Sequence, residues 1–327
     1  MKNRVWIVVA ASATSLMLAA AFQPSGAFVA VSAASAQAFE LSKGVVVDPG
    51  SGVFYVMNLQ HGIDAVELAS GNVIWRSTSG AEPLLVFDDR LVASAEASAD
   101  DRVLPIAVID TARGELLKRA AVPLPPPVFA SIDDAMGSSF TADASMAGGE
   151  IEVSWRFTQA TGLARPGPAP PEMNGVALID PKTARVRVLP AGSPPTQRRA
   201  SPNGGAPVDI RPKPGFTLTI TSADGRTILA NKPAGHDATG LIDYLWAIYS
   251  LQTGARLGEI RMPTSAAPFF VWKSIVIYVS RPYGRRVNGN WIQEPLALRA
   301  VDLTNDRERW KTPIRDRAYH GPLPPRP

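Results

Sequence analysis

Few residues in this chain have the types and the spacing that catalysis or metal binding requires. The sequence contains three histidines, His61, His236 and His320, and no cysteine. No two histidines lie three or four residues apart, so paired metal ligands of that kind are absent. The lack of cysteine excludes thiolate nucleophiles and zinc sites built on thiolates. Serine lacks the GxSxG context of a hydrolase nucleophile. We therefore predict no catalytic, cofactor-binding or metal-binding residue.

Two local groups of polar residues have both a chemical and a structural interpretation. His236 stands beside Asp237 and could mark a polar site, or it could be a turn histidine next to a capping aspartate. The pair Asp133–Asp134 could share a proton or bind a cation. Its match to Asp88–Asp89 in a similar segment favours a solvated turn.

One segment has the composition of a binding surface for another protein. "SRPYGRRVNGNWIQEP", Ser280–Pro295, is rich in arginine and aromatic residues, which are enriched at interface hot spots. It lies between two apolar segments, so we expect an enlarged loop. In the alternative interpretation, the tryptophan covers the end of the barrel and the arginines are solvated. The predicted partner-binding residues are Arg281, Tyr283, Arg285, Arg286 and Trp291.

Residues 1–38 have the pattern of an export signal. Lys2 and Arg4 precede a long apolar run, and "ASAQA" offers small residues for cleavage near Ala36 or Ala38. We expect a periplasmic or secreted protein. The alternative is a protein anchored in the inner membrane by an uncleaved N-terminal segment.

Charge and cysteine content limit the partners. Removal of residues 1–38 would lower the net charge from +4 to +2, because Lys2 and Arg4 are lost and no acidic residue is lost. A charge of +2 gives no general attraction to nucleic acid. Without cysteine, a lipid-modified cysteine cannot anchor the chain. We expect envelope proteins as partners, no nucleic acid, no lipid anchor, and a monomer.

An internal repeat is the strongest feature of the sequence. Two or more apolar residues precede a polar anchor residue, and a turn residue follows the anchor four positions later. The anchors are Glu67, Asp110, Asp180, Ser250 and Asp302. The turn residues are Gly71, Gly114, Ala184, Gly254 and Asp306. This pattern predicts a β-hairpin whose anchor side chain accepts hydrogen bonds from the turn and whose glycine supplies a positive φ.

Each repeat contains further strands. In two copies the second strand ends on a tryptophan, Trp75 or Trp310, which we expect to pack against a neighbouring unit. A second hairpin recurs at 81–94 and 266–280, and another at 140–157 and 216–233. Each unit therefore holds about four short strands.

These units predict an all-β fold, a β-propeller of four-stranded antiparallel blades, over residues 39–316. Five repeats are recognisable, and the blade number stays open. Insertions rich in proline and glycine lie near 159–174 and 190–207, and residues 317–327 are expected to form a flexible tail. An all-β sandwich is the alternative fold.

"AVELASGNVIW" and "AVDLTNDRERW" resemble the quinoprotein-type, or PQQ-like, β-propeller repeat. The resemblance implies a propeller. It also implies two possible functions. Non-catalytic members include the outer-membrane assembly propeller lipoprotein, which suggests an exported protein-binding or scaffold module of the cell envelope without a cofactor. The alternative is a dehydrogenase of an alcohol or sugar that depends on PQQ and calcium.

Overall fold

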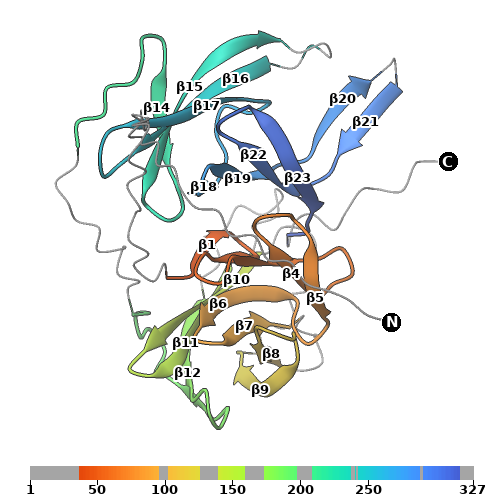
Figure 1. Ribbon diagram of the computed structural model, residues 1–327. Helices are drawn as coiled ribbons and strands as arrows, with labels where there is room; N and C mark the ends of the chain where they lie inside the picture. The colour runs from red at the N-terminus through yellow and green to blue at the C-terminus, as the bar shows by residue number, and fades with distance from the viewer. Residues whose placement is uncertain are drawn as a thin grey trace, which may run out of the picture. The chain divides into compact units, whose positions relative to one another are not determined.

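The computed structural model describes residues 37–95, 102–125, 139–158, 173–196, 208–236, 240, 242–287 and 290–316. These residues form strands and turns, and no helix occurs among them. The strands make one five-stranded sheet, four four-stranded sheets and one two-stranded sheet (Figure 1). All pairings within these sheets are antiparallel.

Each of the five larger sheets is built from four successive strands that pair in chain order. The first sheet contains β2 (Val45–Asp48), β3 (Val53–Met57), β4 (Ile63–Glu67) and β5 (Val73–Ser77), with β1 (Phe39–Ser42) added at the edge of β2. The second contains β6 (Glu82–Phe87), β7 (Arg90–Ser94), β8 (Val103–Asp110) and β9 (Leu116–Pro123). The third contains β10 (Ser139–Ala147), β11 (Glu150–Thr158), β12 (Met173–Ile179) and β13 (Val186–Val188).

The remaining strands follow the same order with one interruption. The fourth sheet contains β14 (Thr217–Thr221), β15 (Thr227–His236), β16 (Ile242–Ser250) and β17 (Arg256–Met262). The fifth contains β18 (Phe269–Trp272), β19 (Ile275–Ser280), β22 (Ala297–Asp302) and β23 (Arg307–Pro313). Between β19 and β22 the chain forms a separate hairpin of β20 (Tyr283–Val287) and β21 (Asn290–Glu294).

The five anchors occupy the same position in the five sheets, as the repeat predicts. Each one begins the turn between the third and fourth strands, which we call the anchor corner. In every corner the amide of the residue four positions after the anchor donates to the anchor's carbonyl oxygen, at 2.8 to 3.0 Å. That residue has a positive φ in all five copies: Gly71 72°, Gly114 73°, Ala184 59°, Gly254 69° and Asp306 55°. The prediction of repeated, left-handed turns is confirmed, including at Ala184 and Asp306.

Anchor side chains accept hydrogen bonds from their own turns, which was also predicted. Asp180 Oδ1 accepts from the Lys182 amide at 2.8 Å, and Asp302 Oδ1 accepts from the Thr304 amide at 2.8 Å. The Lys182 amide is the main cause that lowers the pKa of Asp180. The Thr304 hydroxyl, followed by Arg309, lowers the pKa of Asp302 to about 2. Both carboxylates are therefore ionised at neutral pH and hold their turns closed.

The two repeat tryptophans dock neighbouring sheets onto one another. The Trp75 ring of the first sheet lies over Gly114 in the second, and its Nε1 donates to the Thr111 carbonyl at 2.8 Å. Trp310 of the fifth sheet donates to the Leu68 carbonyl of the first sheet at 3.1 Å. The prediction that these rings pack against a neighbouring unit is confirmed. The last sheet of the chain consequently packs against the first.

The hydrophobic core lies between the sheets. Separate buried clusters join the fourth sheet to the fifth, the fifth to the first, the first to the second, and the second to the third. Sheets with both faces covered need apolar residues on both faces, and β19 accordingly has all six residues buried.

The chain is an all-β protein with propeller-type blades. The sandwich alternative is wrong, because five separate four-strand units, rather than two facing sheets, build the core.

Several predicted segments lie outside the described residues. They include residues 1–36 of the predicted export signal, the greater part of both predicted insertions, and the tail 317–327. Within the part of the chain that the structure describes, no helix has the length and apolar character needed to span a membrane.

Candidate functional site

Across the five sheets, the longest connections between strands lie at one end and short turns at the other. At the corner end, the anchor corner lies beside the turn between the first two strands. In four sheets a backbone hydrogen bond joins these two turns, for example from the Leu68 amide to the Gly52 carbonyl at 2.9 Å. In the third sheet the equivalent residue is Pro181, which has no amide hydrogen to donate. The corner end is therefore a repeated set of short turns.

At the opposite end, which we call the connection end, lie the strand ends that the longest sequence intervals join. These intervals are residues 95–102, 124–138, 159–172, 189–216 and 281–296. Long connections on a rigid scaffold commonly carry binding residues, whereas tight turns carry the fold. We therefore place the candidate site among the described residues of the connection end.

The segment predicted to be an enlarged loop is a β-hairpin. β20 and β21 pair antiparallel, with Tyr283 opposite Glu294 at the base and Arg286 opposite Trp291 near the tip. The hairpin projects from the connection end of the fifth sheet (Figure 1). Four of the five predicted partner-binding residues lie within it, and Arg281 lies two residues before it. The prediction of a loop is corrected to a paired ribbon, which fixes the positions of these residues relative to one another.

Trp291 forms an exposed aromatic surface on the hairpin. The residue is 69% exposed, so the alternative that it covers the end of the barrel is wrong. The ring lies over Gly284 on the neighbouring strand, where any added Cβ atom would overlap it. Three other tryptophans also lie over glycines, but neighbouring residues bury them: Trp75, Trp155 and Trp310. Trp291 thus has one ring face supported by its own hairpin and remains largely open to solvent.

A buried ionic network supports the base of the hairpin. Arg299, whose side chain is 13% exposed, donates to Glu294 Oε2 at 3.0 Å and to Glu308 Oε2 at 2.9 Å. It also reaches the Tyr283 hydroxyl at 3.4 Å, and Lys311 forms an ion pair with Glu294. Glu294 and Tyr283 belong to the hairpin, whereas Arg299 belongs to β22. The network therefore fastens the hairpin to the fifth sheet.

The ionisation states of this network are fixed near neutral pH. Burial alone would lower the pKa of Arg299, but Tyr278, Tyr283 and the two carboxylates beside it raise that pKa. Burial raises the pKa of Tyr278 well above its usual range, although the charge of Arg299 acts in the opposite direction. Arg299 consequently stays charged and Tyr278 stays protonated.

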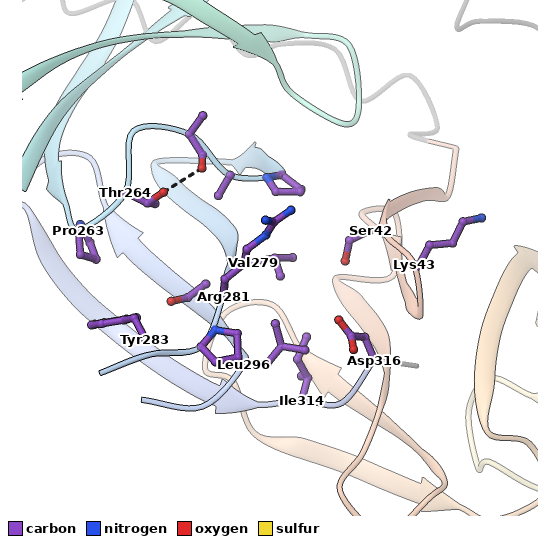
Figure 2. A pocket seen from close by; sticks show the side chains of 15 residues that line it. Ser42, Lys43, Pro263, Thr264, Val279, Arg281, Tyr283, Leu296, Ile314 and Asp316 are labelled. Carbon is purple, nitrogen blue, oxygen red and sulfur yellow. Dashed lines mark hydrogen bonds between the residues drawn. The ribbon is translucent and has the colours of Figure 1, made fainter. Parts of the chain in front are cut away.

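A pocket of about 560 Å³ lies at the base of the hairpin (Figure 2). Its apolar wall includes Val279, Leu296 and Ile314, and Arg281 and Tyr283 stand on the side of the hairpin. Other lining residues come from the β1–β2 turn, from the link between β17 and β18, from the chain between β19 and β20, and from the segment after β23, which includes Asp316. The pocket therefore belongs to the connection end and adjoins the predicted partner-binding residues.

The two histidines that the structure describes, His61 and His236, do not gather into a reactive site. His61 occupies a left-handed turn with φ 62°, and its Nδ1 lies 2.8 Å from Arg315 Nη1. His236 is exposed at the end of β15. His320, Asp237 and the pair Asp133–Asp134 lie outside the described residues.

The described residues offer no cluster of carboxylates of the kind that commonly binds calcium. Calcium requires six to eight oxygen ligands, commonly from several carboxylates. Nowhere in the described chain do three or more acidic, histidine or cysteine side chains gather in a way that could hold a metal ion. No step of quinone chemistry can therefore be assigned to particular residues.

Sequence reasoning missed Gly284, Glu294 and Arg299. Once the strands are known, a glycine and a tryptophan on opposite strands of a ribbon indicate that the aromatic ring lies over the glycine. Arg299 stands in an otherwise apolar segment, and such a position indicates a buried and paired charge. Its partners could not be identified from the sequence.

Comparisons with known proteins add little to this description. No family model and no curated protein match the chain. Solved structures similar to it include BamB from Moraxella catarrhalis, at 13% identity and a TM-score of 0.25, over 77% of this chain and 67% of that chain. The Dos1 propeller has 11% identity and a TM-score of 0.27, over 80% of this chain and 67% of its own. Quinohemoprotein alcohol dehydrogenase from Comamonas testosteroni has 13% identity and a TM-score of 0.28, over 85% of this chain and 43% of its own. Likenesses this weak carry no argument about function.

Proposed function

We propose that this chain is a non-catalytic propeller that binds another protein of the cell envelope through its connection end. The hairpin β20–β21 is the main contact. The observation that carries the proposal is the exposed Trp291 ring, held in place over Gly284 on a ribbon that a buried ionic network supports. A rigid, exposed tryptophan loses little conformational entropy when a partner covers it, which is why this residue is common at hot spots.

The neighbouring residues suit the same role. Tyr283 and three arginines accompany Trp291 in one segment, and tyrosine, tryptophan and arginine are the residue types enriched at hot spots. The predicted export signal supports a periplasmic location. Under this proposal the chain acts as a monomer and needs neither quinone nor metal for binding.

Four purified proteins test the proposal: the wild-type chain and the variants Trp291→Ala, Gly284→Ala and Ile74→Ala. Ile74 is the matched control, because it is 52% exposed and apolar but lies on β5, just after an anchor corner. Each protein is immobilised, and the proteins that it retains from an envelope extract are quantified by mass spectrometry. A retained partner is then purified for measurements of affinity.

We expect Trp291→Ala to weaken partner binding by about 30-fold, which corresponds to about 2 kcal/mol. Gly284→Ala should weaken it in the same direction, because the added methyl group displaces the ring without changing the ring itself. Ile74→Ala should bind as the wild type does. Equal retention by all four proteins would refute the proposal, as would a quinone chromophore in the purified wild-type protein.

A further inference from the structure

The pocket beneath the hairpin contains a positive charge that no described residue pairs with. Arg281 is exposed, and within the described chain its guanidinium forms no ion pair or hydrogen bond. Figure 2 shows its side chain extending into the space enclosed by the other lining residues. Lys43, the other cation of the pocket, differs, because Glu40 and Asp143 neutralise it. Asp316, the carboxylate among the lining residues, also has a partner of its own. The charge available to a ligand is therefore that of Arg281.

The sequence that follows Arg281 is also basic. Residues 280–293 contain Arg281, Arg285 and Arg286 and no acidic residue. The first acidic residue that follows is Glu294, which Arg299 and Lys311 already engage. A carboxylate is the natural partner of a guanidinium, because two parallel N–H donors match its two oxygens. Charge complementarity therefore calls for an acidic ligand.

The pocket and the hairpin further restrict the form of the ligand. Val279, Leu296 and Ile314 give the pocket an apolar wall, which suits an apolar side chain next to the acidic one. Each strand of the hairpin has one paired neighbour, so each presents one backbone edge that a further strand can join. An extended peptide can satisfy all three features at once: the edge, the apolar wall and the charge.

We infer that the partner contributes an extended, acidic segment that places a carboxylate on Arg281 and an adjacent apolar side chain in the pocket. This inference rests on the proposed function and names the chemistry of the partner. The chain's own residues 317–327 follow Asp316 on the pocket wall and are the competing occupant. They contain Arg317 and Arg326 and no acidic residue, so their charge opposes binding at Arg281.

A random heptapeptide display library, selected on the immobilised full chain, tests the inference. The same selection is run on Arg281→Gln, on Trp291→Ala and on Arg211→Gln. Arg211→Gln removes the same charge from a residue that does not line the pocket and whose side chain is 88% exposed. Thermal unfolding of each variant confirms that it is folded.

We expect the wild type and Arg211→Gln to enrich peptides that carry Asp or Glu next to Leu, Ile, Val or Phe. The best peptide, resynthesised, should bind Arg281→Gln about tenfold more weakly. Replacing the peptide's carboxylate by the amide should weaken its binding to the wild type by a similar factor and should leave its binding to Arg281→Gln almost unchanged.

Other outcomes overturn the inference in distinguishable ways. Enrichment of peptides that resemble residues 317–327 would overturn the acidic partner and indicate that the chain's own residues 317–327 bind the pocket. Neutral or basic peptides whose binding needs Trp291 would refute the acidic partner and leave the proposed function standing. Enriched peptides that bind equally well to Arg281→Gln and Trp291→Ala would refute both, and the absence of any enriched peptide would refute the inference.

Discussion

Replacing Gly71 by alanine tests whether tryptophan docking on the anchor corners holds the blades together. Gly71 has φ 72°, a conformation that is unfavourable for residues with a Cβ atom. In addition, an alanine Cβ would lie 2.7 Å from Trp310 Cγ and 2.8 Å from Cδ2. The substitution therefore introduces both backbone strain and a collision between the fifth and first sheets.

The two contributions can be separated. Backbone strain in the left-handed region costs about 1–2 kcal/mol. Overpacking against a buried ring adds about 1–3 kcal/mol, because Trp310 is buried and its indole donates to the Leu68 carbonyl. We expect Gly71→Ala to lower the free energy of unfolding by about 2–5 kcal/mol in total. Gly225 is the matched control, since it has φ 69° and no atom within 4 Å of an added Cβ, and should show the strain alone.

Urea unfolding followed by far-UV circular dichroism measures both variants. The same Gly71→Ala change is then made in a Trp310→Leu background, where the collision is relieved. Its cost there should fall to that of Gly225→Ala. If Gly71→Ala and Gly225→Ala differ by less than about 0.5 kcal/mol, the ring does not press on this glycine, and the docking argument is wrong.

Three further predictions follow from the charged and buried groups. Arg299→Gln leaves Glu294 with Lys311 as its cationic partner and should lower the free energy of unfolding by about 1.5–3 kcal/mol. Arg187→Gln, at an exposed pair, should cost less than about 1 kcal/mol in the same urea assay. The pKa of Asp302 is lower in the folded chain than the usual 3.8. The stabilisation of the fold by the ionised Asp302 carboxylate is therefore complete above about pH 4 and is lost as the pH falls toward 2. A carbon-detected NMR titration of this carboxyl should give a midpoint of about 2. Burial raises the pKa of Tyr278, so this tyrosine should remain protonated at pH 11 while the chain is folded. The stabilisation of the fold by the protonated tyrosine should be lost as the pH rises above about 10. Absorbance at 295 nm, compared between the wild type and Tyr278→Phe, measures the ionisation of this tyrosine.

The anchor corners could be predicted from the sequence because their chemistry is local. An acidic residue that accepts from the next amides and a residue with positive φ four positions later are both properties of a six-residue segment. Asp306 shows how far this reasoning extends, because an aspartate tolerates the left-handed region and replaces the glycine of other copies. Docking of Trp75 and Trp310 was also predictable, since a large ring at the end of an edge strand must be covered.

The hairpin and its support were not predictable for the opposite reason. Tyr283–Val287 contains Gly284 and two adjacent arginines and shows no alternation of apolar and polar residues. Its pairing with Asn290–Glu294 is held from outside by Arg299, which lies on β22 and meets the hairpin only after folding. Periodicity describes faces within one strand and contains no information on such contacts between elements.

The division between the two ends of the sheets explains why the repeat does not reveal the partner. Each anchor corner repeats the same hydrogen bonds, and a surface that occurs five times cannot by itself select one orientation of a ligand. The connection end differs from sheet to sheet, and the hairpin is supported by the fifth sheet without forming part of its core. Under the proposed function, changes at Trp291 or Arg281 should alter binding at little cost in stability, whereas changes at Arg299 should affect both. Selectivity for a partner then resides where the repeat is interrupted.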